Sequence, residues 1–232
     1  MPIGVIVNAL SVLCGGFVGV IIGKYMREDF KNTLTMIFGL CAMCMGISSV
    51  VLMKNMPAVI LSVIVGTMIG IMICLQKRIQ KVATVAVQKM NTKTDMDALI
   101  TIIVLFCASS TGIYGALVSG MSGDHSILIS KSILDFFTAA IFASNMGKIV
   151  SFVSIPQVIV LLALFALSKV IYPFVTDTMI ADFKACGGFL LVATGLRMLK
   201  IKDFPVADMI PAMILVMPLS AMWVSFVLPL LG

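Results

Sequence analysis

The sequence contains few charged and few aromatic residues. Asp, Glu, Lys and Arg together make up 11% of its 232 residues, whereas apolar residues make up 61%. A soluble domain of this size could not cover so much apolar surface with so few charges. The scarcity of charge therefore excludes a soluble globular protein and indicates a chain that lies within a membrane.

Histidine and long polar segments are also scarce, which excludes several classes of site. The single histidine, His125, stands beside Asp124, whereas a zinc site needs three or four protein ligands. Nucleotide-binding, metalloprotease and serine-hydrolase motifs are absent, so we predict no enzyme, no metal site and no cofactor. The longest polar connector, 77–97, is too short for a separate soluble domain. All six cysteines fall in apolar runs, where small buried side chains are expected rather than disulfides.

Long uncharged runs separate the polar connectors. Because about 20 apolar residues cross the hydrocarbon core of a bilayer, each run is a candidate spanning helix. The uncharged runs are 2–23, 32–53, 55–76, 98–123, 149–168 and 209–232, and two further runs, 126–147 and 179–199, carry a few charges. The predicted fold is an all-α polytopic integral membrane protein with about eight transmembrane helices. Seven would remain if one of the charged runs does not span.

The basic residues alternate between connectors in a way that predicts the topology. Of the sixteen Lys and Arg residues, twelve belong to the connectors and helix ends that follow the first, third, fifth and seventh runs. By the positive-inside rule these connectors are cytoplasmic, which places both termini outside a multi-pass bacterial inner-membrane protein. The net charge of +6 is thus a topology signal. The expected partners are the lipid bilayer and a small solute or ion, and no nucleic acid.

Two parts of the chain resemble each other weakly. An Asp-Phe-Lys triplet occurs at 29–31 and again at 182–184. In the same way, Gly39 and Gly46 correspond to Gly188 and Gly195. They divide a single transmembrane domain, 1–232, into candidate repeats 1–76 and 155–229, with 98–148 between them. Because the second repeat would begin on the opposite side, the two would be inverted, a plan common in secondary transporters. Chance similarity between apolar segments is the alternative.

The cytoplasmic connector 77–97 carries apolar residues at helical spacing, with basic residues on other faces. This pattern favours a short amphipathic helix near anionic lipid headgroups, with a solvated loop as the alternative. Thr94 and Asp97 would then cap the span that follows.

Two charges interrupt the run 126–147 and are the strongest lead to a working site. Lys131 and Asp135 are four residues apart, so they lie on one face of a helix. A charge at bilayer depth costs about 2.5–3.5 kcal/mol, and such residues normally face a protein interior or a water-filled cavity. Thr138 and Asn145 continue this face as a polar stripe. We expect Asp135 to be an ion or proton site with Lys131 as its partner or an anion contact; an internal ion pair that fixes helix packing is the alternative.

Further polar residues are candidates to line a cavity. Ser109, Ser110 and Thr111 lie in mid-run, where they weaken a helix and offer hydroxyls; an unbroken helix with back-bonded hydroxyls is the alternative. Asn8 is an intramembrane amide and needs partners. Glycines at four-residue spacing, at 15, 19 and 23 and again at 66 and 70, predict close helix packing and would also suit a homo-oligomer.

Three segments together resemble a known family. They are Asn8-Ala9-Leu10 with the glycines after it, the stretch from Gly123-Asp124 through Lys131 and Asp135 to Ala143-Ser144, and Gly187-Gly188 with Gly195-Leu196. They are similar to the YdfK/YqgA-like bacterial inner-membrane family, catalogued as domain-of-unknown-function family 554, over essentially the whole chain. The resemblance implies an integral membrane protein described as a candidate transport protein, and it assigns no site residues.

The expected function is therefore secondary transport, or channel-like passage, of a small solute or ion. The alternative is a non-transporting membrane scaffold or assembly protein in which the Lys131–Asp135 pair holds helices together. A polar cavity lined by Asp135 would favour transport. A dry, packed core with the pair satisfied would favour a scaffold.

Overall fold

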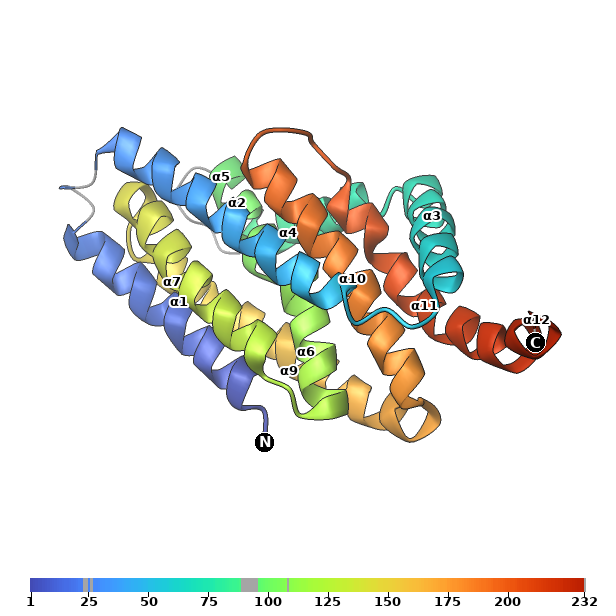
Figure 1. Cartoon of the computed structure of the whole chain (residues 1–232). Helices are drawn as coiled ribbons and strands as arrows, with labels where there is room; N and C mark the ends of the chain where they lie inside the picture. The colour runs from blue at the N-terminus through green and yellow to red at the C-terminus, as the bar shows by residue number, and fades with distance from the viewer. Residues whose placement is uncertain (23–24, 26, 89–95, 108, 232) are drawn as a thin grey trace. The chain divides into compact units, whose positions relative to one another are not determined.

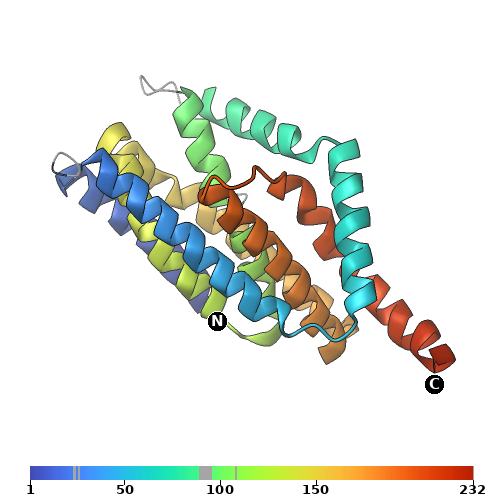
Figure 2. The same cartoon turned by 45° about the horizontal axis from the view of Figure 1, so that its top comes forward.

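All regular elements in the described part of the chain are helices (Figures 1 and 2). The computed structural model describes residues 1–22, 25, 27–88, 96–107 and 109–231; within these ranges the side chains of 86–88, 96–98, 100, 101, 110 and 231 lie outside the description. The α-helices are α1 (Ile3–Ile22), α2 (Glu28–Val50), α3 (Met56–Met72), α4 (Leu75–Gln88), α5 (Met96–Cys107), α6 (Ser110–Ser122), α7 (Ser126–Met146), α8 (Ile149–Phe152), α9 (Ser154–Ile171), α10 (Asp177–Met198), α11 (Ile210–Met222) and α12 (Leu228–Leu231). The described chain also contains the 3-10 helices η2 (Tyr172–Phe174) and η3 (Val206–Met209) and the π-helix η4 (Trp223–Val227).

The number of helices that could cross a membrane agrees with the prediction. Among the described residues, seven helical stretches are long and apolar enough, and the pair α3 and α4, bent by 52° at a short break, makes an eighth if it counts as one span. Both charged runs of the sequence are among the seven, as α7 and α10. The fold is thus an all-α membrane protein with seven to eight long apolar helices.

The chain forms two compact units. Unit 1 consists of Met1–Ile37 and Lys77–Val170, and unit 2 consists of Phe38–Gln76 and Ile171–Gly232. Helices α1 and α5 to α9 therefore belong to unit 1, α3, α10 and α11 belong to unit 2, and α2 contributes to both. These bounds differ from those of the repeats 1–76 and 155–229, and the inverted repeat stays a prediction.

In unit 1, glycines bring α1 against α7. A Cβ added at Gly15 or Gly19 would collide with the carbonyl oxygens of Phe136 and Ala140, respectively. The contact positions rise together along both helices, so α1 and α7 run in the same direction, and they lie side by side in Figure 1. Close packing is therefore what these glycines provide, as their four-residue spacing predicts. Apolar side chains fill the unit around this contact, including the fully buried Val12.

In unit 2, glycines bring α3 against α11 and α2 against α10. A Cβ at Gly66 would collide with the backbone of Ala212. A Cβ at Gly46 would lie 2.7 Å from the carbonyl oxygen of Gly188, and one at Gly39 would lie 3.0 Å from that of Gly195. The four glycines of the predicted repeat thus pack directly against one another.

The amphipathic helix predicted in the connector 77–97 is present as α4. Its basic residues Lys77, Arg78 and Lys81 are exposed, whereas Ala83 is buried. Thr94 and the side chain of Asp97, the predicted cap, lie outside the described residues.

We expect Gly19→Leu to lower the thermal unfolding midpoint of the detergent-solubilised protein by about 3–10 °C, because the larger side chain must separate α1 from α7. The matched control is Cys14→Leu, which adds the same side chain at an exposed position of α1. The control should stay within about 2 °C of the parent. Equal midpoints for the two variants would contradict the packing described here.

Candidate functional site: a buried carboxylate cluster

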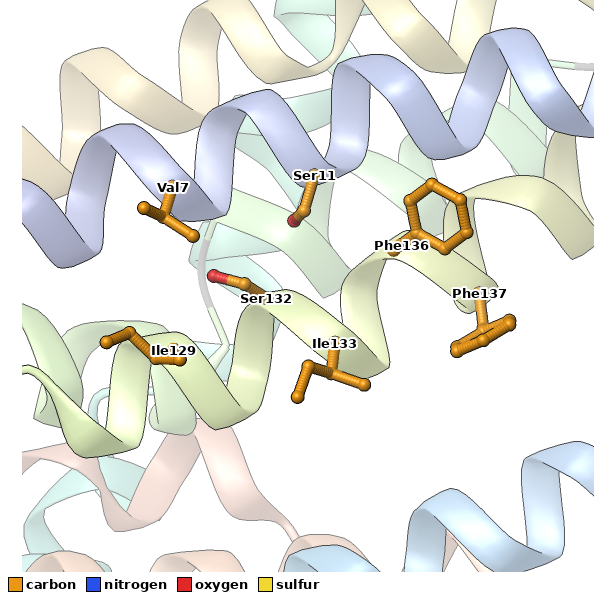
Figure 3. A pocket seen from close by; sticks show the side chains of 7 residues that line it. All are labelled: Val7, Ser11, Ile129, Ser132, Ile133, Phe136 and Phe137. Carbon is orange, nitrogen blue, oxygen red and sulfur yellow. The ribbon is translucent and has the colours of Figure 1, made fainter.

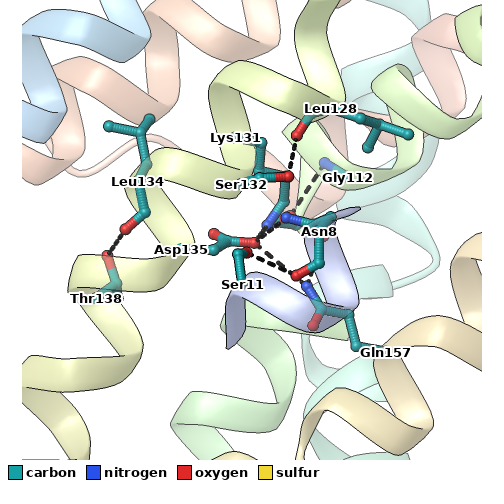
Figure 4. Close-up of polar contacts among 11 residues, drawn as sticks. Asn8, Ser11, Gly112, Leu128, Lys131, Ser132, Leu134, Asp135, Thr138 and Gln157 are labelled. Atoms are coloured by element: carbon teal, nitrogen blue, oxygen red, sulfur yellow. Dashed lines mark hydrogen bonds and ion pairs between the residues drawn. The ribbon is translucent and has the colours of Figure 1, made fainter. Parts of the chain in front are cut away.

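Four polar side chains from three helices of unit 1 form a cluster, in which three surround the carboxylate of the fourth (Figure 4). They are Asn8 of α1, Lys131 and Asp135 of α7, and Gln157 of α9, and we call them the Asp135 cluster. Their exposed fractions are 0%, 3%, 8% and 0%. The predicted ion pair thus lies in the protein interior, together with the predicted Asn8.

The bonds of the cluster converge on a single oxygen. Oδ2 of Asp135 forms the ion pair with the Lys131 ammonium and accepts a hydrogen bond from Asn8 Nδ2 at 2.8 Å. Gln157 Nε2 donates to the same oxygen at 3.3 Å and to Asn8 Oδ1 at 2.8 Å. The two amides therefore link α1 and α9 to the carboxylate on α7.

The Lys131 ammonium has apolar as well as polar surroundings. It lies 5.8 Å from the centre of the Phe106 ring, whose face attracts a cation weakly. On another side, a Cβ at Gly112 of α6 would lie 3.2 Å from Lys131 Cε. Removing either partner of such a buried pair would leave an uncompensated charge, which is strongly destabilising.

Two acceptor positions of the cluster stay unused within the described part of the chain. Gln157 Oε1 is buried and has no hydrogen-bond partner. Asp135 Oδ1 accepts none of the bonds recorded there, since every contact of this carboxylate is made by Oδ2. Buried polar atoms are nearly always paired, so Gln157 Oε1 is an unsatisfied buried acceptor, whereas Asp135 Oδ1 belongs to a side chain that keeps 11% of its surface exposed.

The polar stripe predicted along α7 divides into separate contacts. The Thr138 hydroxyl donates to the carbonyl oxygen of Leu134, in its own helix, at 2.8 Å. Asn145 is exposed, and its Oδ1 accepts a hydrogen bond from Lys31 Nζ at 3.1 Å. Lys31 also bonds to Glu28 at 2.8 Å. Positions that share a helix face thus have different partners, because neighbouring helices cover only part of that face.

The serine-rich segment of the fourth run lies where α6 begins. Ser109 is the N-cap of α6, and its hydroxyl oxygen accepts a hydrogen bond from the Gly112 backbone N–H at 3.1 Å. Thr111 is buried, and the Ser110 side chain lies outside the described residues. Because Gly112 adjoins Lys131, the cap places this helix start beside the cluster.

An apolar groove of about 290 Å³ runs between α1 and α7 (Figure 3). It is lined by Val7, Ser11, Ile129, Ser132, Ile133, Phe136 and Phe137. Its two hydroxyls donate to backbone carbonyl oxygens of their own helices, Ser11 to Asn8 and Ser132 to Leu128, each at 2.7 Å. Asp135 does not line this groove, so the groove is not the polar cavity that would favour transport.

Unit 2 holds a second buried carboxylate that the sequence analysis missed. Asp182 of α10 is 0% exposed and accepts four hydrogen bonds, and we call it and its partners the Asp182 cluster. Its Oδ1 accepts from the backbone N–H groups of Lys54 and Asn55 at 2.8 and 2.9 Å. Its Oδ2 accepts from Asn55 Nδ2 at 2.8 Å and from the Ser220 hydroxyl at 2.6 Å. The carboxylate thereby caps the start of α3.

The two clusters share a sequence signal. Asn8 and Asp135 are 127 residues apart, and so are Asn55 and Asp182. Helix α1, which contains Asn8, and helix α3, which follows Asn55, also share a motif. It is Leu-Ser-Val and two glycines, at 10–12, 15 and 19 in α1 and at 61–63, 66 and 70 in α3. This relation of α1 to α3 could have located Asp182 from the sequence. Gln157 has no comparable signal.

No group of three or more His, Cys, Asp and Glu side chains among the described residues is placed to hold a metal ion. The arrangement of the Asp135 cluster can hold one positive charge against one carboxylate and offers two further acceptor oxygens. It contains no nucleophile activated by a base in the contacts recorded.

We expect Asp182→Ala to destabilise the protein by about 3 kcal/mol or more, because two backbone N–H groups and two side chains lose their buried acceptor. The exposed Asp203, which pairs with Arg197, provides the control Asp203→Ala, expected to cost about 1 kcal/mol or less. Thermal unfolding in detergent measures both. A fully stable Asp182→Ala variant would contradict the capping role.

The comparisons with known proteins identify a family. The family model described as "Protein of unknown function (DUF554)" matches residues 3–221. The chain is 45% identical over 233 residues to "Uncharacterized protein YqgA" of Escherichia coli strain K12, covering 97% of this chain and 99% of that protein. It is 24% identical over 218 residues to "Uncharacterized membrane protein YdfK" of Bacillus subtilis strain 168, covering 91% and 93%. No solved structure matches. The apolar helices and the relative YdfK, which is named as a membrane protein, show that this protein is a membrane protein. It belongs to the DUF554 family of proteins of unknown function.

Proposed function

We propose that the protein is a multi-pass transport protein of the bacterial inner membrane that carries a small solute or ion. The Asp135 cluster is its binding site. The supporting observation is the buried Lys131–Asp135 pair, which lies beside two acceptor oxygens without partners. Replacing a buried ion pair with apolar side chains is often neutral or stabilising, so stability alone does not account for it.

Each member of the cluster has a role in this proposal. Asp135 supplies the charge that binds the substrate or coupling ion. Lys131 neutralises the carboxylate when nothing else is bound. Asn8 and Gln157 orient the carboxylate through their amide groups and tie three helices to the site.

The distribution of basic residues supports the orientation in the membrane. The exposed Lys77, Arg78 and Lys81 of α4 fall in a connector that the positive-inside rule assigns to the cytoplasm. An amphipathic helix with exposed lysines and valines, such as Val82 at 71% exposure, suits the membrane surface. Both chain termini are then on the outer side.

The second candidate function is a membrane scaffold. It is favoured by the dry environment of the Lys131–Asp135 pair and by the apolar lining of the groove between α1 and α7. In that case the pair would fix helix packing, and the protein would move nothing across the membrane. The two candidates differ in whether Asp135 changes its partner during function.

We expect Asp135→Asn to reduce transport at least about tenfold, because it removes the charge that binds the substrate or coupling ion. The measurement is electrogenic or tracer uptake into proteoliposomes, with a panel of Na⁺, K⁺, NH₄⁺, Cl⁻ and neutral amino acids as probes. Asp203→Asn, at an exposed site, is the matched control and should transport like the parent.

Two outcomes would overturn the proposal. One is uptake by Asp135→Asn that equals that of the parent. The other is a correctly folded parent protein that moves no probe of the panel, which would favour the scaffold.

A further inference from the structure

The buried aspartates Asp135 and Asp182 are satisfied by donors of different kinds. Asp182 is held on both oxygens, partly by backbone N–H groups that cannot leave it. Asp135 is held on one oxygen, and its charged partner is the end of the flexible side chain of Lys131 (Figure 4). The Asp182 cluster shows that this protein can bury an aspartate by using neutral donors. Burial alone therefore does not require Lys131.

The unused groups around Asp135 are hydrogen-bond acceptors. Gln157 Oε1 is buried without a partner, and Asp135 Oδ1 has none among the described residues. The terminal amide of a glutamine turns about a soft torsion, so Gln157 can present either its oxygen or its nitrogen to the carboxylate. A site with spare lone pairs suits a cation or a donor of hydrogen bonds and does not suit an anion.

The net charge of the Lys131–Asp135 pair indicates which ligand charge the site can accept. Lys131 and Asp135 together carry no net charge, and an unbalanced charge in the interior is costly. A monovalent cation can replace the ammonium of Lys131 at Asp135 without changing the charge of the site. An anion bound to Lys131 would leave the carboxylate as a second negative charge in the same interior.

We propose that the Asp135 cluster binds a small monovalent cation in exchange for the ammonium of Lys131, which acts as a tethered competitor. The ligands are the Asp135 carboxylate and the side-chain oxygen of Gln157. This inference rests on the proposed transport function and names the class of its substrate or coupling ion. Ammonium-type ions and alkali-metal ions share the required charge and size.

The position of Lys131 gives its ammonium a route out of the site. Lys131 is five residues from Ser126, the first residue of α7, or about 7 Å along the helix axis. Side chains of a helix lean toward its N-terminus, and a lysine stem can lie along apolar surface while its charge reaches the interface. The displaced ammonium can thus move toward the loop at His125 while α7 stays in place.

Binding can be measured on the whole protein in detergent. The probes are NaCl, KCl, NH₄Cl and methylammonium chloride, each titrated at constant ionic strength against N-methylglucamine chloride, whose cation is too large for the site. We expect at least one probe to raise the thermal unfolding midpoint in a saturable manner. A response to NH₄⁺ and methylammonium alone would assign an ammonium-type ligand, and a response to Na⁺ or K⁺ would assign an alkali-metal ion.

Variants of Lys131 separate competition from simple stabilisation. Lys131→Met removes the competitor, so the responding cation should bind at least about tenfold more tightly than to the parent. Lys131→Arg keeps the pair with a stronger, bidentate partner and should weaken cation binding by about the same factor. If Lys131→Met does not fold without salt, Lys131→Arg alone still tests the proposal.

Further variants control for indirect effects. Asp135→Asn should abolish the response, and Gln157→Met should weaken it about tenfold. The matched control is Ser220→Ala, which removes one donor from the Asp182 cluster and should lower the midpoint without changing the cation affinity.

The inference is overturned if no probe shifts the midpoint of the folded parent protein, or if Lys131→Arg binds the cation as tightly as the parent does. If transport still depends on Asp135 in that case, the proposed transport function stands and only the inference of a monovalent cation is rejected. If transport also does not depend on Asp135, both the inference and the proposed function are rejected.

Discussion

A buried carboxylate that cannot reach water must find its hydrogen-bond donors inside the protein, and this requirement shapes both units. In each unit an asparagine meets an aspartate 127 residues later. Asn8, within α1, meets Asp135, and Asn55, just before α3, meets Asp182. An asparagine side chain is short, so the helices that carry these pairs must approach closely. Gly15 and Gly19 permit that approach between α1 and α7 by bringing backbone against backbone.

The two carboxylates then differ in how firmly they are held. Asp182 anchors the start of α3 through the backbone, and its four donors leave neither oxygen free. Asp135 depends on Lys131, the longest and most mobile donor of its cluster, and on amides that bond to the same oxygen. The same residue pair thus caps a helix in unit 2 and belongs to an ion-paired cluster in unit 1. The difference arises from a lysine one helical turn before the aspartate.

Local features were predictable from the sequence, and contacts between distant segments were not. The spans follow from uninterrupted apolar length, and the Lys131–Asp135 pair follows from a spacing of four on one helix. The cap of α3 at Asp182 was missed because two of its donors are backbone N–H groups, which any residue carries. Gln157 was missed because its partners lie on other helices, 149 residues away on α1 and 22 residues away on α7.

The predicted stripe on α7 shows the same limit. Thr138 and Asn145 do share a face with Asp135 by helical period. However, a threonine hydroxyl can bond to its own helix, and Asn145 contacts Lys31, which is 114 residues away in the sequence.

Glycine contacts also hold the helices of unit 1 together. A Cβ added at Gly120 of α6 would lie 2.6 Å from the Phe165 carbonyl oxygen of α9. Helices α6 and α9 are therefore in close contact, as α1 and α7 are. Gly115 of α6 packs in turn against Leu128 of α7, so α6 connects the two helix pairs. The Gln157 amide adds a polar connection, because it bonds from α9 to Asn8 of α1 and to Asp135 of α7.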